Sequence, residues 1–311
     1  MRDRFIEALT NRAKTDTSIV LVTGDLGFGV LDKFVSACPK QYINAGVAEQ
    51  NMTAIAAGMG LTGKKVFTYS IANFPTLRCL EQIRNDACYH KADVKVVAVG
   101  GGFSYGALGA SHHATEDLAI LRSLPDIVVL APSGLWEAVE AVDVMLSNEG
   151  TCYVRLDKSF GDDSPRNGES KIQFGKLREL HEGVDAAVFV SGGILEEVMD
   201  ARTALADKGI RLGVFTVPFI KPLDVAGVVS ACVKYGNIVT VEEHTLDGGL
   251  GSAIAEVIAD HGIQMRGFKR LGLKGVFSSV VGSQKYLRKT YGLDAASIVL
   301  AVSGLVEKRD K

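Results

Sequence analysis

The chain has 311 residues, of which 47% are hydrophobic and 23% charged, and this length suits about two domains that each bury a core. Its 34 basic and 36 acidic side chains leave a net charge of -2, which argues against nucleic acid or an anionic membrane as a partner. The N-terminus is charged from Arg2 onward and no apolar run has the length of a bilayer span, so we expect a cytoplasmic protein.

Apolar segments alternate with helical patterns through the first half of the chain. An amphipathic helix is predicted at 3–15, before a buried strand at 19–23. Further strands are predicted at 65–71, 94–99, 127–130 and 152–156, and helices at 48–60, 75–90, 116–123 and 134–147. Uniformly apolar strands between helices are typical of a parallel sheet that is covered on both faces. We therefore predict a doubly wound α/β domain over residues 1–165.

A polar stretch interrupts this pattern, and we place a linker at residues 166–178. A second alternating set follows it. Its strands are predicted at 186–191, 212–217, 238–241 and 268–273, and its helices at 194–208, 224–235, 250–261 and 283–291. The sequence thus predicts a second, smaller doubly wound α/β domain over residues 179–311.

One carboxylate, Glu49, begins a predicted helix among small and apolar residues such as Ala48 and Ala56. An acid that loses solvent in this way suits a hydrogen bond to a heterocyclic nitrogen. The alternative is an ordinary acid in the first turn, where it favours the helix dipole. The local pattern leaves both interpretations open.

Other polar and aromatic residues follow the predicted strands, where ligands of parallel sheets collect. Asp25 lies in a glycine-rich turn after the first strand, and Phe74 and Arg78 come after the strand at 65–71. The ring of Phe74 suits stacking on a planar ligand, although a single phenylalanine is more often a core residue. The turn around Asp25 could equally be structural.

A glycine-rich segment at 100–117 carries two adjacent histidines, His112 and His113. An imidazole transfers protons near neutral pH, but adjacent residues do not easily face one site, so we expect at most one to be catalytic. A solvent-exposed or capping histidine pair is the alternative. The five cysteines form no CxxC pair and no other His or Cys has ligand spacing, so we predict neither disulfides nor a metal site in this chain.

Taken together, these stretches resemble the C-terminal two-thirds of transketolase, the thiamine-diphosphate enzyme that moves a two-carbon ketol unit. The matching segments follow the order of that family over nearly the whole chain: Gly24-Asp25-Leu26, Gly46-Val47-Ala48-Glu49-Gln50-Asn51-Met52, Gln82-Ile83-Arg84, Gly109-Ala110-Ser111-His112-His113 and Glu242-Glu243-His244. The resemblance implies a thiamine-diphosphate pyrimidine-binding domain followed by a transketolase C-terminal domain.

The resemblance also implies roles for particular side chains. Glu49 would hydrogen-bond the pyrimidine ring of the cofactor and favour the tautomer that removes the thiazolium proton. Phe74 would line the pyrimidine pocket, Asp25 and Gln50 would lie near the cofactor, and His112 would act near the reacting carbonyl. The residues expected on the substrate side, with arginines suited to a sugar phosphate, are His113, Arg155, Arg2 and Arg78.

The half of a transketolase that holds the diphosphate and its Mg²⁺ has no counterpart here, because no Gly-Asp-Gly stretch is followed by the asparagine motif. The resemblance therefore implies a separate N-terminal subunit that carries the diphosphate-binding domain, with the cofactor between the chains and an α2β2 assembly. The chain alone should be inactive.

Two departures concern the substrate. Gly100 stands where typical transketolases carry a histidine, and Leu108 stands where they carry an aspartate. Since those residues contact substrate hydroxyl or phosphate groups, we expect a sugar or sugar phosphate other than the usual pentose phosphates. The beta subunit of a 2-oxoacid dehydrogenase and a non-catalytic partner subunit are the alternative functions.

Overall fold

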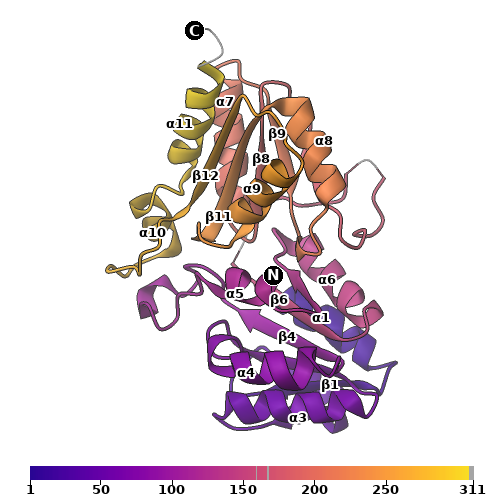
Figure 1. Ribbon diagram of the computed structural model, residues 1–311. Helices are drawn as coiled ribbons and strands as arrows, with labels where there is room; N and C mark the ends of the chain where they lie inside the picture. Colours follow the sequence, from indigo (N-terminus) through magenta and orange to yellow (C-terminus); the bar gives the residue numbers. More distant parts are fainter. Residues whose placement is uncertain (159, 167, 308–311) are drawn as a thin grey trace.

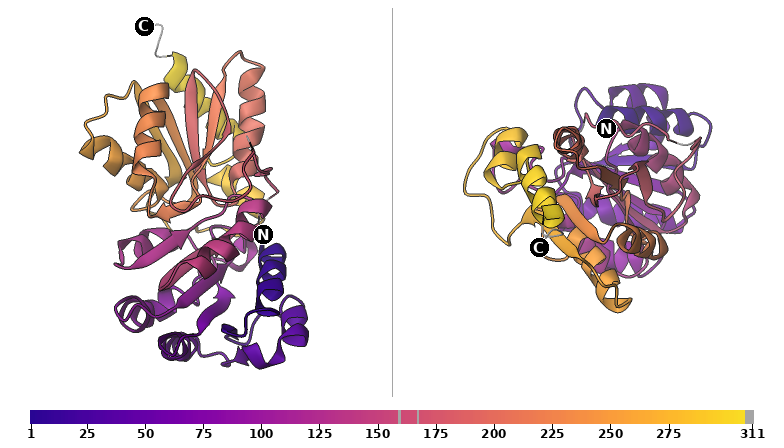
Figure 2. Two further views of the ribbon diagram at one scale, coloured as in Figure 1. Left: turned by 90° about the vertical axis from the view of Figure 1, so that its right-hand side faces the viewer. Right: turned by 90° about the horizontal axis from the view of Figure 1, so that it is seen from above.

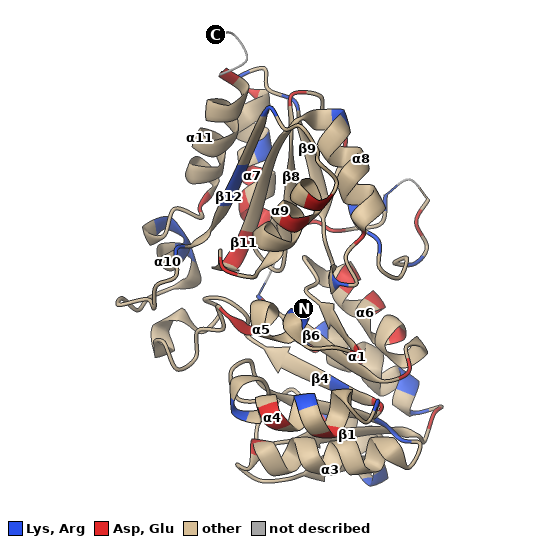
Figure 3. Ribbon diagram, viewed as in Figure 1, with Lys and Arg blue, Asp and Glu red and all other residues tan. Residues whose placement is uncertain are grey.

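The computed structural model describes residues 1–158, 160–166 and 168–307. The few remaining positions of the predicted domains and linker, 159, 167 and 308–311, lie outside the described residues. Two α/β units are stacked one on the other, with the N-terminus at their junction and the C-terminus at the far end of the second unit (Figures 1 and 2). Basic and acidic residues occur on elements of both units (Figure 3).

The first unit is built on a seven-stranded sheet in the order β10-β5-β6-β4-β3-β1-β2, parallel except for β10. Its strands are β1 (Ile19–Thr23), β2 (Tyr42–Asn44), β3 (Lys65–Ile71), β4 (Val94–Val99), β5 (Ile127–Leu130), β6 (Thr151–Leu156) and β10 (Phe219–Lys221). One face packs against α1 (Arg2–Ala13), α2 (Asp32–Ala37) and α6 (Leu135–Ser147). The other face packs against α3 (Glu49–Leu61), a helical segment at 77–88 and α5 (Asp117–Ser123).

The second unit has a five-stranded sheet in the order β12-β11-β8-β9-β7, parallel except for β7. Its strands are β7 (Arg178–His181), β8 (Ala186–Ser191), β9 (Leu212–Thr216), β11 (Asn237–Thr245) and β12 (Gly267–Leu273). The helices α7 (Leu195–Ala206) and α11 (Ala295–Val306) cover one face, and α8 (Val225–Tyr235) and α9 (Leu250–Asp260) the other. Helices on both faces of two mainly parallel sheets confirm the predicted fold class.

Several elements were not predicted. The strands β2 and β10 have three residues each, too few for a periodic pattern, while α11 is apolar on nearly all sides and lacks the alternation of a surface helix. The predicted helix at 75–90 is divided into η2 (Leu77–Cys79), α4 (Leu80–Gln82) and the π-helical η3 (Ile83–Cys88). Two further short turns are η1 (Pro39–Gln41) and η4 (Gly106–Leu108).

The prediction that no run has the length of a bilayer span needs a correction. Among the described residues, Gln284–Val306 is long and apolar enough by length and composition, with a mean hydropathy of 1.2. In the structure this stretch forms two helices, α10 (Gln284–Thr290) and α11, which are separated by a turn. The second of them packs against α7 and β11, as the core helix of an α/β domain does.

The strand β10 links the two units. It belongs to the later half of the sequence, yet it pairs antiparallel with β5 at the edge of the first sheet, with Phe219 opposite Leu130. Ile220 belongs to a core cluster that also holds Leu124 from the first unit and Val228 from the second. The units therefore share apolar packing across the boundary that the sequence suggested at 166–178.

Candidate active site

The candidate residues gather at the carboxyl edge of the first sheet. Glu49 opens α3 shortly after β2, Phe74 follows β3, and His112 lies in the glycine-rich loop after β4. Because these strands are parallel and adjacent or nearly so, their following turns share one edge.

Glu49 is buried, with 2% of its surface exposed, which agrees with the first of the two interpretations of its local sequence. Gly24 allows the close packing, since a Cβ there would lie 3.2 Å from Cγ of Glu49. The carboxylate is not isolated: its Oε2 accepts a hydrogen bond of 2.7 Å from Nη1 of Arg78. The side chain of Arg78 is 46% exposed, so the pair lies where the buried interior meets the open edge.

A row of side chains continues from this pair. The guanidinium carbon of Arg78 lies 4.6 Å from the ring centre of Phe74, and the Phe74 ring meets the His112 ring edge to face at 5.4 Å. The His112 ring is in turn 6.4 Å from the Tyr105 ring. The edge thus offers a carboxylate that can hydrogen-bond a ring nitrogen, an aromatic wall and an imidazole that can hold or move a proton.

The two adjacent histidines have different surroundings. His112 is partly exposed, and its Nδ1 is 3.0 Å from the Ser111 hydroxyl. His113 is buried, packs against Phe103 and has its Nε2 3.1 Å from the Gly106 carbonyl. His113 therefore supports the loop from within, and His112 is the histidine that faces Phe74.

A pocket of about 380 Å³ lies beyond Tyr105 on the same edge. It is lined by three basic side chains, two acidic ones and several apolar or small residues: Arg2, Arg4, Lys158, Asp3, Asp157, Met1, Val99, Gly100, Tyr105, Leu135, Leu156 and Phe160. Arg2 pairs with Asp3 at 2.8 Å, and the basic side chains exceed the acidic ones by one. The Tyr105 ring packs directly on Gly100, where a Cβ would lie 2.1 Å from Cε2 of the ring, and the Lys158 amine is 5.4 Å from the ring centre. The sequence analysis did not identify Tyr105 as a pocket residue. The signal for it was Gly100, because the space that a side chain at position 100 would fill is taken by the Tyr105 ring.

The remaining candidates are placed elsewhere. Asp25 is exposed and exchanges hydrogen bonds of 2.9 and 3.1 Å with Asn44, and Gln50 is exposed on the first turn of α3. Arg155 is buried and donates to Asp157 at 3.0 Å and to Asp117 at 3.3 Å.

Burial opposes the charge of Arg155, but the two carboxylates outweigh it and raise its pKa above the ordinary arginine value. A third donor, Nη2, reaches the Glu243 carbonyl at 2.9 Å. These contacts occupy Arg155 inside the protein and keep it from the pocket that Arg2 lines.

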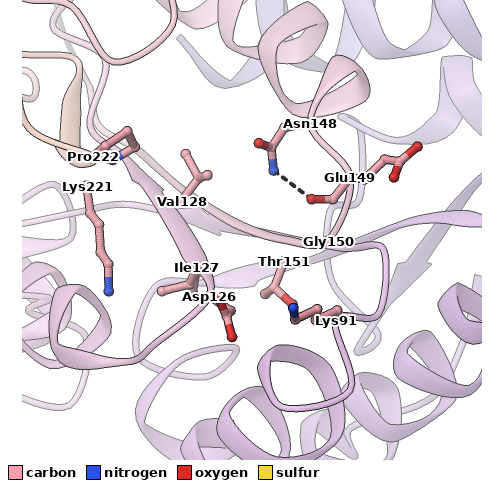
Figure 4. Close-up of a pocket in the computed structure, with 10 residues that line it drawn as sticks. All are labelled: Lys91, Asp126, Ile127, Val128, Asn148, Glu149, Gly150, Thr151, Lys221 and Pro222. Carbon is pink, nitrogen blue, oxygen red and sulfur yellow. Dashed lines mark hydrogen bonds between the residues drawn. The ribbon is translucent and has the colours of Figure 1, made fainter.

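A larger pocket, of about 590 Å³, lies at the opposite edge of the sheet, beside the amino ends of β5 and β6 (Figure 4). Lys91, Asp126 and Lys221 line it, but the Lys221 amine donates to the carbonyls of Arg122 and Leu124. Since it is remote from the row of candidate side chains, we do not assign it to the same chemistry. In the part of the chain that the structure describes, no group of three or more His, Cys, Asp or Glu residues could hold a metal ion.

Comparisons with known proteins agree on one family. Residues 1–161 match the pyrimidine binding domain of transketolase, and residues 175–298 match the transketolase C-terminal domain. A subunit of an apulose-4-phosphate transketolase from Actinobacillus succinogenes is 34% identical over 97% of this chain and 96% of its own length. A 6-deoxy-6-sulfo-D-fructose transketolase subunit from Clostridium sp. is 31% identical over 100% of this chain and 95% of its own.

A solved structure described as a split gene transketolase, inactive beta4 tetramer, has a similar fold. It superposes with a TM-score of 0.87 at 32% identity and covers 98% of this chain and 97% of its own. The likeness extends over both units.

Proposed function

Because the chain belongs to the transketolase family and carries its pyrimidine-binding and C-terminal domains, we propose that it is the C-terminal subunit of a split transketolase. Such an enzyme transfers a two-carbon ketol unit from a ketose donor to an aldehyde acceptor. The observation that carries the proposal is the row of Glu49, Phe74 and His112 on successive turns of one sheet edge. The two family matches favour this reaction over that of a 2-oxoacid dehydrogenase, and the row of site residues favours it over a non-catalytic subunit.

The residues at this edge fit the pyrimidine ring of thiamine diphosphate. A buried carboxylate suits a hydrogen bond to a ring nitrogen, and Phe74 suits packing against the ring face. When bound, thiamine diphosphate supplies the nucleophilic carbon for ketol transfer. Glu49 then orients the ring and holds a proton at its nitrogen, while His112 holds or moves a proton at the substrate carbonyl oxygen. Asp25 and Gln50, which are both exposed, keep their proposed place near the cofactor.

The diphosphate and Mg²⁺ are proposed to bind mainly to a partner subunit. Mg²⁺ needs an octahedral set of oxygen ligands, and the described residues offer no acidic cluster for it. A cytoplasmic α2β2 assembly with an N-terminal transketolase subunit would complete the site. The solved split-gene relative is an inactive tetramer of beta chains, which supports the view that such a chain needs a partner.

The proposed substrate is a sugar with an anionic group. Arg2, Arg4 and Lys158 line the pocket beyond Tyr105, and cationic side chains suit a phosphate or sulfonate. The two acidic side chains of the lining, Asp3 and Asp157, are paired with Arg2 and Arg155. The names of two relatives, which refer to a sugar phosphate and a sulfo-sugar, support this class. We assign the anion to this pocket. The other candidates have different roles: Arg155 is held in buried ion pairs, Arg78 forms an ion pair with Glu49, and His113 packs inside the glycine-rich loop.

The substitution Glu49→Gln tests the proposal in the assembly reconstituted with the N-terminal subunit. It keeps the shape of the side chain but removes the group that exchanges a proton, so hydrogen–deuterium exchange at the thiazolium carbon should fall by about 100-fold or more. Glu149→Gln, at an exposed carboxylate on the opposite edge of the sheet, is the control and should exchange normally. Unchanged exchange in Glu49→Gln would exclude the role given to Glu49.

A further inference from the structure

A carboxylate from the second unit reaches into the glycine-rich loop of the first. Glu243, near the end of β11, is 2% exposed, and its Oε1 accepts a hydrogen bond from the backbone N–H of Phe103. The same carboxylate accepts from Nε of Arg288 at 2.5 Å and from Nε2 of Gln284 at 2.9 Å. Both of these donors are on α10, which lies beside the loop at the junction of the two units (Figure 1).

The Glu243 carboxylate packs tightly against the backbone of the loop at Gly102. A Cβ at Gly102 would lie 2.6 Å from Oε1 of Glu243, and Gly102 has a φ of +57°, so both space and conformation favour glycine there. Arg288 is itself fixed, because it also donates to Glu196 at 2.5 Å and to the Gly193 carbonyl at 3.1 Å. The acceptor for the Phe103 N–H is therefore held at a defined position by the second unit.

The contacts of Phe103 connect this fixed position to the part of the loop that bears His112 and His113, here called the histidine arm. Phe103 is fully buried, stacks on Tyr291 of the second unit at 5.5 Å and meets the His113 ring at 5.1 Å. Gly102 and Ala114 exchange backbone hydrogen bonds of 2.7 and 3.0 Å that close the base of the loop.

The other side of the arm is held by the first unit. The side-chain amide of Asn73, the residue before Phe74, donates to the His113 carbonyl at 2.7 Å and to the Ser111 carbonyl at 3.3 Å. His112 lies between these two anchored residues. Its placement against Phe74 thus depends on an anchor from each unit.

We propose that Glu243 is a positioning residue, through which the second unit fixes the glycine-rich loop so that His112 lies in the active site. The inference rests on the proposed function of His112. It gives the second unit a part in catalysis although none of its residues is placed against the cofactor.

Two variants separate this role from simple support of the fold. Glu243→Gln keeps the length of the side chain and an oxygen acceptor for the Phe103 N–H; its amide nitrogen faces Nε of Arg288, whose other nitrogens still donate to Glu196 and to the Gly193 carbonyl. Glu243→Asp keeps the charge that Arg288 needs but is one methylene too short to reach the loop. Glu242→Asp is the matched control, because Glu242 is 1% exposed on the same strand but binds the N-terminus of α9, at Leu250 N and Gly251 N.

In the reconstituted assembly, Glu243→Asp should lower kcat by about 10- to 100-fold, as expected for a misplaced catalytic group, with little change in KM. Glu243→Gln should retain most of the activity. Exchange at the thiazolium carbon, which depends on Glu49, should be normal in both variants. The opposite order, in which Asp is tolerated and Gln is not, would show that the charge matters and the reach does not, and would overturn the proposal.

A readout on the chain itself does not need activity. The NMR signals of the His112 ring should move in Glu243→Asp and stay in place in Glu243→Gln and Glu242→Asp. Unmoved His112 signals in Glu243→Asp would refute the proposal even if the assembly proved inactive. Absence of thiazolium exchange in the wild-type assembly would instead count against the proposed function.

Discussion

The guanidinium of Arg78 bridges Glu49 and Phe74, at 2.7 Å from the carboxylate of the first and 4.6 Å from the ring centre of the second. It occupies an oxygen of the carboxylate that we propose to hydrogen-bond the pyrimidine nitrogen. We expect the cofactor and Arg78 to compete for this oxygen, Oε2, so that breaking the ion pair opposes cofactor binding.

Removing that competitor should favour the cofactor. Since partly exposed ion pairs contribute about 0–1 kcal/mol, Arg78→Gln should tighten thiamine diphosphate binding by up to about fivefold in a calorimetric titration of the assembly. Arg84→Gln, at an exposed arginine of the same helical segment, should leave binding unchanged. Binding weakened by about tenfold in Arg78→Gln would instead make Arg78 a direct ligand of cofactor or substrate.

The hydroxyl of Tyr105 is expected to contact the substrate. Tyr105→Phe keeps the packing on Gly100 but removes the hydroxyl of a residue that lines the pocket and whose ring centre lies 6.4 Å from that of His112. Because a hydrogen bond to a charged group is worth about 1.5–3 kcal/mol, KM for a phosphorylated ketose should rise by about tenfold or more. Steady-state kinetics with the phosphorylated and the free ketose check this, with Tyr89→Phe, at an 80% exposed tyrosine, as the control. Equal changes for both substrates would contradict a contact with the phosphate.

The Arg155 cluster should matter for stability. Arg155→Met leaves the buried carboxylates of Asp117 and Asp157 without their cation, and breaking a buried pair in this way costs about 3–5 kcal/mol. Arg12→Met removes the partner of Asp143 in an exposed pair and should cost less than about 1 kcal/mol. Urea unfolding of both variants measures the difference. Similar decreases in the free energy of unfolding of the two variants would indicate that the buried ion pairs of Arg155 contribute no more to stability than the exposed pair of Arg12.

Three buried thiols predict a loss of stability in alkali. Burial raises the pKa of Cys79, Cys88 and Cys232 to about 11, from an ordinary value of 9.0. The folded chain keeps these protons where the unfolded chain releases them, so their contribution is complete below pH 9 and is lost as the pH rises toward 11. The urea midpoint should fall over this range, and less steeply in Cys232→Ala. An identical slope in that variant would rule out Cys232 as a contributor.

The general fold could be predicted because strands such as β4 and β8 are apolar at all but one position and alternate with helices. The burial of Glu49 was one of two interpretations that its small and apolar neighbours in sequence left open, because the residues that cover it, such as Gly24, come from other turns. The pairing of Glu49 with Arg78 could not be predicted, since it joins residues that are distant in sequence and is set by how α3 packs beside the segment after β3.

Local sequence was also silent on which histidine faces the site. His112 and His113 share the same neighbours in the chain, and contacts with Phe74 on one side and Phe103 on the other distinguish them. Glu243 belongs to a segment with family resemblance, but its reach into the loop depends on the docking of the two units. Tertiary packing decides such relationships, and local propensity does not encode them.

Because β10 pairs with β5, the first unit is not complete without a strand from the later half of the chain. A fragment that ended at the sequence boundary near residue 165 would lose β10 and expose the apolar edge of β5, where Leu130 is opposite Phe219 in the intact chain. Unpaired apolar strand edges recruit other strands, so the isolated fragment would tend to aggregate. A chimaera of two family members would therefore need both of its units from the same parent chain.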